Sequence, residues 1–272
     1  MRVFSLVAGV VAILSAPAAT AATRAPTGKW IVDFGESQCV ASRNYGTAAS
    51  PLLFGLKLPA AGNVVSLMIL RPSNGGGRFP EQIDTEIQLD WSKVLRKSAL
   101  ALNVSETKQR LIRIILPLSE FVDLAKSRSA AFKIGGELNE TFQFSQMPEL
   151  VKALDECVVG LRQYWNMSEA EGPNPVLRER VSGNLQNIFS PGDFPAVAVR
   201  KGIEGAVAVA LLIDEKGKVA DCTVVSTSGA PALDAQSCYV ITRRAKFKPA
   251  IGSDERPARD SYLQRINWRL AL

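Results

Sequence analysis

The stretch Ile203-Glu-Gly-Ala-Val-Ala-Val-Ala-Leu-Leu-Ile-Asp214 decides how the last third of the chain folds. Every second residue in it is large and apolar: Val207, Val209, Leu211 and Ile213. Most of the positions between them are alanine. A period of two predicts a β-strand, and a strand with one bulky face and one small face suits a sheet that carries a helix on one side.

The residues around this strand predict a small unit of mixed elements. Phe194 to Gly202 has the pattern of a short helix that has Pro195 in its first turn and ends at a glycine. Glu215 to Lys218 predicts a hairpin turn, and a return strand follows from Val219 to about Ser226. A second helix is expected from Pro231 to about Ala245.

The end of the chain predicts a last strand with one buried face and one wet face. The two faces carry Tyr262, Gln264, Ile266, Trp268 and Leu270 on one side, and Arg265, Asn267 and Arg269 on the other. The order helix, strand, strand, helix, strand predicts two helices on one face of a three-stranded antiparallel sheet. We expect the last strand at an edge of this sheet, where unpaired N–H and C=O groups accept an added strand.

The first part of the chain predicts a β-rich domain that ends in an amphipathic helix. Apolar runs indicate strands at 30–34, 52–58, 64–70, 83–89 and 111–116. Ser119 is expected to cap a short helix over 120–126. Apolar residues then recur at helical spacing between Pro148 and about Trp165. The fold class of the whole chain is therefore expected to be α+β, with two domains.

Helix breakers divide the chain near residue 170. The stretch 169–175, Glu-Ala-Glu-Gly-Pro-Asn-Pro, is acidic and typical of a linker. We expect a β-rich domain of unassigned ligand at 23–168, a linker at 169–193 and a second domain at 194–272.

The N-terminus has the features of a secretory signal peptide over residues 1–22. Arg2 precedes an apolar stretch from Val3 to Ala16, Pro17 ends it, and Ala19-Thr-Ala21 fits a cleavage site. A helix over this stretch spans about 21 Å, less than the roughly 30 Å hydrocarbon core of a bilayer. We therefore expect export by a cleavable segment; an uncleaved anchor in the inner membrane is the alternative.

The four cysteines become interpretable once export is expected, because that compartment permits disulfides. Three pairings are possible. The simplest joins Cys39 to Cys157 and Cys222 to Cys238, so that each half has its own cross-link. Four buried free thiols are the alternative.

The composition excludes several classes of site. The chain contains no histidine, which rules out a Ser-His-Asp triad, a Cys-His pair and a His-ligated zinc site. There is no CxxC pair and no glycine-rich phosphate loop after a strand. We therefore expect no catalytic residues, no metal site and no cofactor. Export argues against a nucleic-acid partner, despite the net charge of +6.

A series of short motifs follows the order found in a known family. They are Phe194-Pro195, Gly202-Ile-Glu-Gly205, Asp214-Glu-Lys-Gly-Lys-Val219, Ser226-Thr-Ser-Gly229 with Pro231-Ala-Leu-Asp234, and Lys246-Phe-Lys-Pro-Ala250. Together they resemble the C-terminal domain of TonB. The Cys222 and Cys238 pair is not part of the basic family pattern.

This resemblance implies a periplasmic module that binds the amino-terminal TonB box of an outer-membrane receptor. In such domains the box adds as a β-strand to the last strand, here 262–270, and the expected partner is a TonB-dependent receptor or another envelope protein. The partner-binding residues are then Phe194, Pro195, Tyr262, Gln264, Ile266 and Trp268. Some of these side chains also suit the core, and both roles are compatible because strand addition uses backbone groups.

Two departures from the family pattern shape the functional expectation. A motor-coupled TonB keeps a transmembrane helix with a histidine and a long proline-rich spacer, and this chain lacks the histidine and the spacer. We therefore favour a non-catalytic, soluble binding module linked to TonB-dependent transport. The alternatives are a membrane-anchored energy transducer, and an envelope scaffold or an enzyme hosted by residues 23–168.

Four cations stand at the end of the second predicted helix: Arg243, Arg244, Lys246 and Lys248. Cations at this position complement the helix dipole, which predicts a solvated face. Contact with an anionic lipid headgroup is the alternative.

Overall fold

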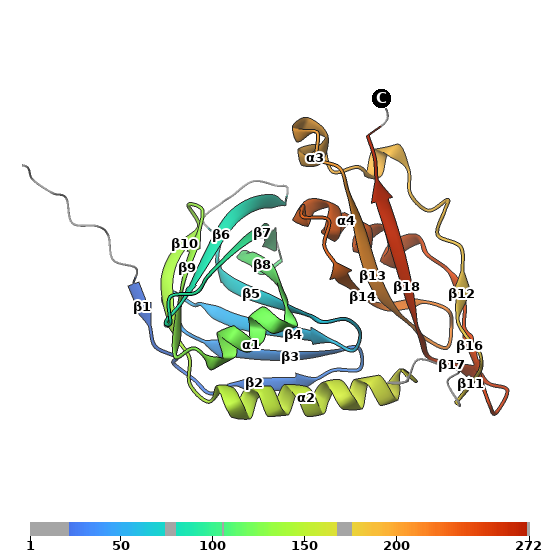
Figure 1. The fold of residues 1–272 in the computed structure, drawn as a ribbon, viewed down its shortest axis with the longest axis horizontal. Helices are drawn as coiled ribbons and strands as arrows, with labels where there is room; N and C mark the ends of the chain where they lie inside the picture. Colours follow the sequence, from blue (N-terminus) through green and yellow to red (C-terminus); the bar gives the residue numbers. More distant parts are fainter. Residues whose placement is uncertain (1–21, 74–79, 105, 168–175, 271–272) are drawn as a thin grey trace, which may run out of the picture.

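The computed structural model describes residues 22–73, 80–104, 106–167 and 176–270. They form two units that lie side by side (Figure 1). The N-terminal unit comprises residues 22–167 and the C-terminal unit comprises residues 176–270. The expected signal peptide, apart from Ala22, and the linker stretch 169–175 lie outside the described residues.

One curved sheet forms most of the N-terminal unit (Figure 1). In space its strands follow the order β1-β10-β9-β6-β7-β8-β5-β4-β3-β2. All neighbours are antiparallel except β1 and β10, which are parallel. The strands are β1 (Ala22–Arg24), β2 (Ile31–Phe34), β3 (Gln38–Asn44), β4 (Leu53–Pro59), β5 (Val64–Pro72), β6 (Glu81–Leu89), β7 (Val94–Val104), β8 (Gln109–Pro117), β9 (Ser129–Ile134) and β10 (Leu138–Gln143).

One face of this sheet forms the core of the unit. In β5 and β8 buried and half-buried residues alternate, and Leu67 and Ile114 are fully buried. Two helices pack against that core, α1 (Leu118–Lys126) and α2 (Met147–Tyr164). Among the described residues, no helix combines the length and the apolar character that crossing a membrane requires.

The helix α2 matches the predicted amphipathic helix and is cross-linked to the sheet. Leu150, Leu154 and Leu161 are buried on its inner face. On the same face Cys157 forms a disulfide with Cys39 of β3, with 6.0 Å between the Cα atoms. The second predicted pair, Cys222 and Cys238, also forms a disulfide.

The predicted capping role of Ser119 is wrong. The helix α1 begins at Leu118, its N-cap residue is Pro117, and no side chain caps it. The chain enters the helix directly from β8, and the N–H of Leu118 donates to the carbonyl of Asn63 at 2.7 Å. A backbone acceptor from another loop therefore satisfies an N–H group at this helix start.

The C-terminal unit is built on a small antiparallel sheet with the strand order β14-β13-β18. Its central strand β13 (Gly205–Ile213) buries Val207, Val209 and Leu211 completely. At Gly202 the backbone turns left-handed, with φ 61°, and ends the first helix. The other elements of this core are α3 (Ala196–Lys201), β14 (Val219–Ser226), α4 (Pro231–Arg244) and β18 (Asp260–Trp268).

Residues 176–193, which we expected in the linker, pack against the C-terminal unit. Leu177, Val181 and Leu185 are buried in its core. Short strands in this segment pair with strands that follow α4, β11 with β16 and β12 with β15. The elements are β11 (Leu177–Glu179), β12 (Ser182–Gly183), the 3₁₀ turn η1 (Pro191–Asp193), β15 (Phe247–Lys248), β16 (Ala250–Gly252) and β17 (Pro257–Ala258).

The edge strand β14 faces the N-terminal unit. Lys57 of β4 donates to the carboxylate of Asp221 on β14 at 3.0 Å. Gly62, with φ 90°, lies so close to Val225 of β14 that a Cβ atom at position 62 would come within 2.4 Å of that side chain. One edge of the small sheet is therefore in contact with the N-terminal unit.

Removal of the long-range disulfide should destabilise the protein more than removal of the short-range one. The chain-entropy model assigns about 5 kcal/mol to a cross-link between residues 118 apart and about 3 kcal/mol to one between residues 16 apart. We expect Cys39→Ser/Cys157→Ser to lower the urea concentration at the unfolding midpoint further than Cys222→Ser/Cys238→Ser does. Equal midpoints for the two variants would contradict this ranking.

Candidate functional site

The outer edge of β18 borders a groove. On one side β18 pairs with β13, and within the described residues no strand pairs with its other side. Along that side runs a groove of about 950 Å³ between β18 and the segment from Gly183 to Phe194. An unpaired edge presents backbone N–H and C=O groups to whatever enters the groove. The geometry can therefore receive an extended chain.

The inner face of β18 belongs to the core. Ile266 and Trp268 are buried, and the indole N–H of Trp268 donates to the hydroxyl of Ser237 at 2.9 Å. The rings of Phe189 and Phe194 meet the Trp268 ring edge-to-face, with centroid distances of 5.5 and 5.3 Å. These contacts fix the strand while its backbone edge stays beside the groove.

The opposite wall of the groove is held by one arginine. Arg244, in the last turn of α4, donates to the two carboxylate oxygens of Asp193 at 2.6 and 2.8 Å and to the carbonyl of Ile188 at 2.8 Å. The backbone N–H and the hydroxyl of Ser190 donate to the same carboxylate, each at 2.7 Å. Hydrogen bonds from Arg244 and then from Ser190 hold the pKa of Asp193 well below its usual range.

The structure brings five of the six predicted partner-binding residues together. Phe194, Tyr262, Gln264, Ile266 and Trp268 all line the groove. Pro195 does not: it is the N-cap residue of α3 and lines a different cavity between the two units.

Sequence reasoning missed the wall between Gly183 and Pro191. Gln186 and Phe189 line the groove from a segment that we expected in the linker. The one local signal was the Ser190-x-x-Asp193 spacing, which matches the capping box that the structure forms there.

The cations that the sequence groups at the end of α4 contact different partners in the structure. Arg244 pairs with Asp193, and Lys248 donates to Glu179 at 3.1 Å. The guanidinium of Arg243 lies 5.3 Å from the centroid of the Tyr239 ring. Two of the four cations therefore have acidic partners within the chain, and a third stacks on an aromatic ring.

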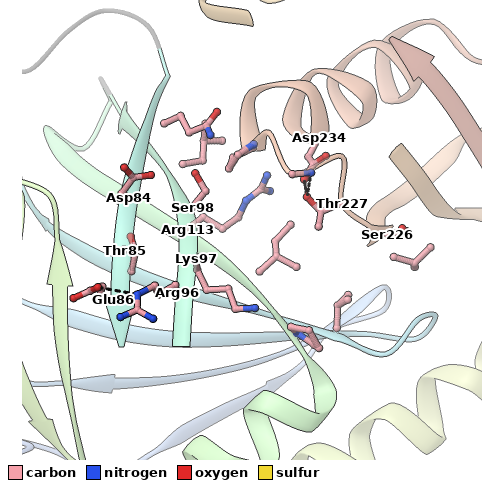
Figure 2. Close-up of a pocket in the computed structure, with 18 of the residues that line it drawn as sticks. Asp84, Thr85, Glu86, Arg96, Lys97, Ser98, Arg113, Ser226, Thr227 and Asp234 are labelled. Atoms are coloured by element: carbon pink, nitrogen blue, oxygen red, sulfur yellow. Dashed lines mark hydrogen bonds and ion pairs between the residues drawn. The ribbon is translucent and has the colours of Figure 1, made fainter. Parts of the chain in front are cut away.

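A polar cleft of about 840 Å³ lies between the two units. Figure 2 shows Asp84, Glu86, Arg96 and Ser98 on the N-terminal side and Thr227 and Asp234 on the C-terminal side. Many of these groups have partners: Arg96 donates to Glu86 at 3.1 Å, and Asp234 accepts from Thr227 and from the N–H of Ser228.

The guanidinium of Arg113, also in this cleft, makes no hydrogen bond or ion pair with the described residues. Burial lowers the pKa of its guanidinium, and the nearby Asp234 opposes that shift. The part of the chain that the structure describes contains no group of three His, Cys, Asp or Glu side chains placed to hold a metal ion.

Comparison with known proteins identifies the C-terminal unit. Residues 191–270 match the family model of the Gram-negative bacterial TonB protein C-terminal. This segment is a TonB C-terminal domain. The match confirms the resemblance noted in the sequence and begins at the 3₁₀ turn before α3. A search of curated proteins gave no match.

The TonB C-terminal family is a non-catalytic, transport-associated domain. Domains of this family interact with outer-membrane receptors, and TonB family proteins are associated with the cell envelope. The groove beside β18 lies within the matched residues, except for the part of its wall before Pro191.

The Asp193–Arg244 pair should make the stability of the C-terminal unit depend on acid pH. Because the folded state lowers the pKa of Asp193, its contribution is complete above the pKa of an unfolded aspartate, about 3.9, and is lost as the pH falls further. We expect Asp193→Asn to lower the thermal midpoint at pH 7 and to approach the wild type below about pH 4. Glu156→Gln, at an exposed position of α2, is the control; pH profiles of Asp193→Asn and wild type that stay parallel would contradict the assignment.

Proposed function

We propose that this protein is a non-catalytic periplasmic binding module that recognises an extended segment of an outer-membrane receptor by β-strand addition to β18. The observation that carries the proposal is the unpaired edge of β18 beside a groove of about 950 Å³. In this arrangement the incoming segment forms main-chain hydrogen bonds with β18, and its side chains contact the groove walls. The protein thereby takes part in TonB-dependent transport.

The predicted site residues divide into two roles under this proposal. Trp268 and Ile266 hold the strand from the buried side, so they position the edge. Gln264, Tyr262 and Phe194 line the groove and contact the bound segment. Pro195 sets the start of α3 rather than touching the partner.

We assign residues 23–168 to a separate extracytoplasmic domain that restricts which edge is available. This assignment is supported by two contacts with β14, of Lys57 with Asp221 and of Gly62 with Val225. A partner strand is therefore directed to β18, since the other edge of the small sheet already faces protein. The expected signal peptide over residues 1–22 supplies export in this proposal.

Strand addition should be visible in the backbone of β18. A TonB-box peptide titrated into the isotopically labelled protein should shift the amide signals of residues 260–268 more than those of β14. A peptide of the same sequence with alternate amides N-methylated should bind at least about tenfold more weakly, because each missing main-chain hydrogen bond costs about 0.5–1.5 kcal/mol. Equal affinity for the two peptides would exclude a main-chain mode of binding.

The groove itself can be blocked at an exposed position. Gln186 lines the groove, and its exposed neighbour Asn187 does not. We expect Gln186→Trp to weaken TonB-box peptide binding by about tenfold or more, through steric exclusion of the incoming strand, and Asn187→Trp to leave it unchanged. Isothermal titration calorimetry measures both variants, and thermal melting checks that each is folded. The same affinity for both variants would place the peptide elsewhere.

A further inference from the structure

An apolar cavity of about 990 Å³ lies between the two units, at β6 and β7 on one side and at α3 and α4 on the other. Its walls include Leu100 and Leu102 from the N-terminal unit and Val197, Ala232 and Ala235 from the C-terminal unit. Ligand pockets in proteins measure roughly 300–1,000 Å³ and are lined mainly by apolar side chains with a few polar groups. Both units contribute to this cavity, so it exists only in the assembled chain.

Positive charges border the cavity. Arg200 and Lys201, the last two residues of α3, line it and are exposed, and their charged side-chain groups make no hydrogen bond or ion pair with the described residues. Tyr239, which also lines the cavity, carries Arg243 over its ring. The acid in the lining, Glu81, is already paired with Arg110 at 2.7 Å. The cavity therefore combines apolar walls with unpaired cations.

We propose that this cavity binds a long-chain fatty acid. The acyl chain lies against the apolar walls, where each buried methylene contributes about 0.8 kcal/mol. The carboxylate lies between Arg200 and Lys201, because a carboxylate that leaves water needs charged or hydrogen-bonding partners. A neutral ester would leave Arg200 and Lys201 without an anionic partner, and these two cations would repel a cationic amphiphile.

This site is distinct from the groove beside β18. The two cavities share no lining residue, and the consecutive residues Phe194 and Pro195 fall into different ones. The fatty-acid proposal therefore does not depend on strand addition, and each proposal can fail while the other holds.

Fluorescence titration of the full mature chain with dansylundecanoic acid tests the proposal. We expect saturable binding with a blue-shifted emission, and displacement of the probe by palmitate. Methyl palmitate and an alkyltrimethylammonium salt of equal chain length should displace the probe at least about tenfold less well, because neither carries a carboxylate. An absence of saturable binding, or equal displacement by palmitate and its methyl ester, would overturn the proposal.

Two double variants locate the carboxylate. Arg200→Glu/Lys201→Glu should raise the dissociation constant by about tenfold or more. The control Lys216→Glu/Lys218→Glu makes the same change of charge at exposed positions of the turn between β13 and β14, and should leave the constant unchanged. Equal weakening by both would mean that general attraction to a basic protein explains the binding, which would also overturn the assignment.

Ala235→Phe places a large side chain in the cavity and tests the position of the acyl chain. We expect loss of probe binding, with thermal melting to show that the variant is folded. Its binding of the TonB-box peptide should not change, since Ala235 lines the cavity and not the groove. Retained probe affinity in this folded variant would exclude the cavity as the site.

Discussion

The C-terminal unit depends on what happens to the backbone N–H and C=O groups at the two edges of its small sheet, because within the described part of the chain no strand pairs with them there. With the order β14-β13-β18, only β13 is paired on both sides. An edge strand with unpaired N–H and C=O groups can pair with other chains, so proteins cover such an edge, shield it or bind a partner there. Here Lys57 and Gly62 of the N-terminal unit contact side chains of β14, while β18 borders the groove. The two edges thus have different surroundings: side chains of β14 contact the N-terminal unit, and the edge of β18 borders the groove.

The inner side of β18 explains how an edge strand can stay ordered without a second neighbour. Trp268 joins three elements: it is hydrogen-bonded to Ser237 of α4 and packed against Phe189 and Phe194. The same rings contribute to the floor and wall of the groove. Trp268 therefore contributes to the stability of the unit, whereas Gln186, at an exposed position of the wall, is available for contact within the groove.

Much of the fold follows from local periodicity, and the exceptions have physical causes. The alternation in 203–214 and 262–270 predicted β13 and β18, although β18 runs from Asp260 to Trp268, because each strand has a clear apolar face. The strands β1, β7, β9 and β10 were not predicted. In β7 polar side chains stand on both faces, Arg96 and Ser98 on one and Lys97, which donates to Glu120 of α1 at 2.7 Å, on the other, so its sequence lacks a simple pattern. In β2 the alternation is present, yet Ile31 and Phe34 are both mostly exposed because the strand lies at the sheet edge.

In the candidate site, too, local sequence patterns predicted one part, and contacts between residues far apart in the sequence form the other. The family motifs predicted the strand side of the groove, because strand and turn signals are local. The opposite wall depends on contacts between residues far apart in sequence: Arg244 lies 51 residues after Asp193, and Trp268 packs on Phe189. No local sequence pattern indicates such pairs. Residues 176–193 lack a regular pattern and follow the stretch 169–175 with its two prolines, so the sequence predicted a linker there.

The helix α3 borders both the groove beside β18 and the cavity between the two units. Phe194 and Val199 line the groove, while Pro195, Val197 and Arg200 line the cavity between the units. A six-residue helix cannot rotate or shift without moving both sets of side chains. Occupation of one cavity changes the other where it displaces α3, or where it displaces α4, whose Ala235 lines the cavity and whose Ser237 holds Trp268 of the groove. Because Gly202 ends the helix in a left-handed turn and Pro195 fixes its start, α3 is held at both ends, which favours independent sites.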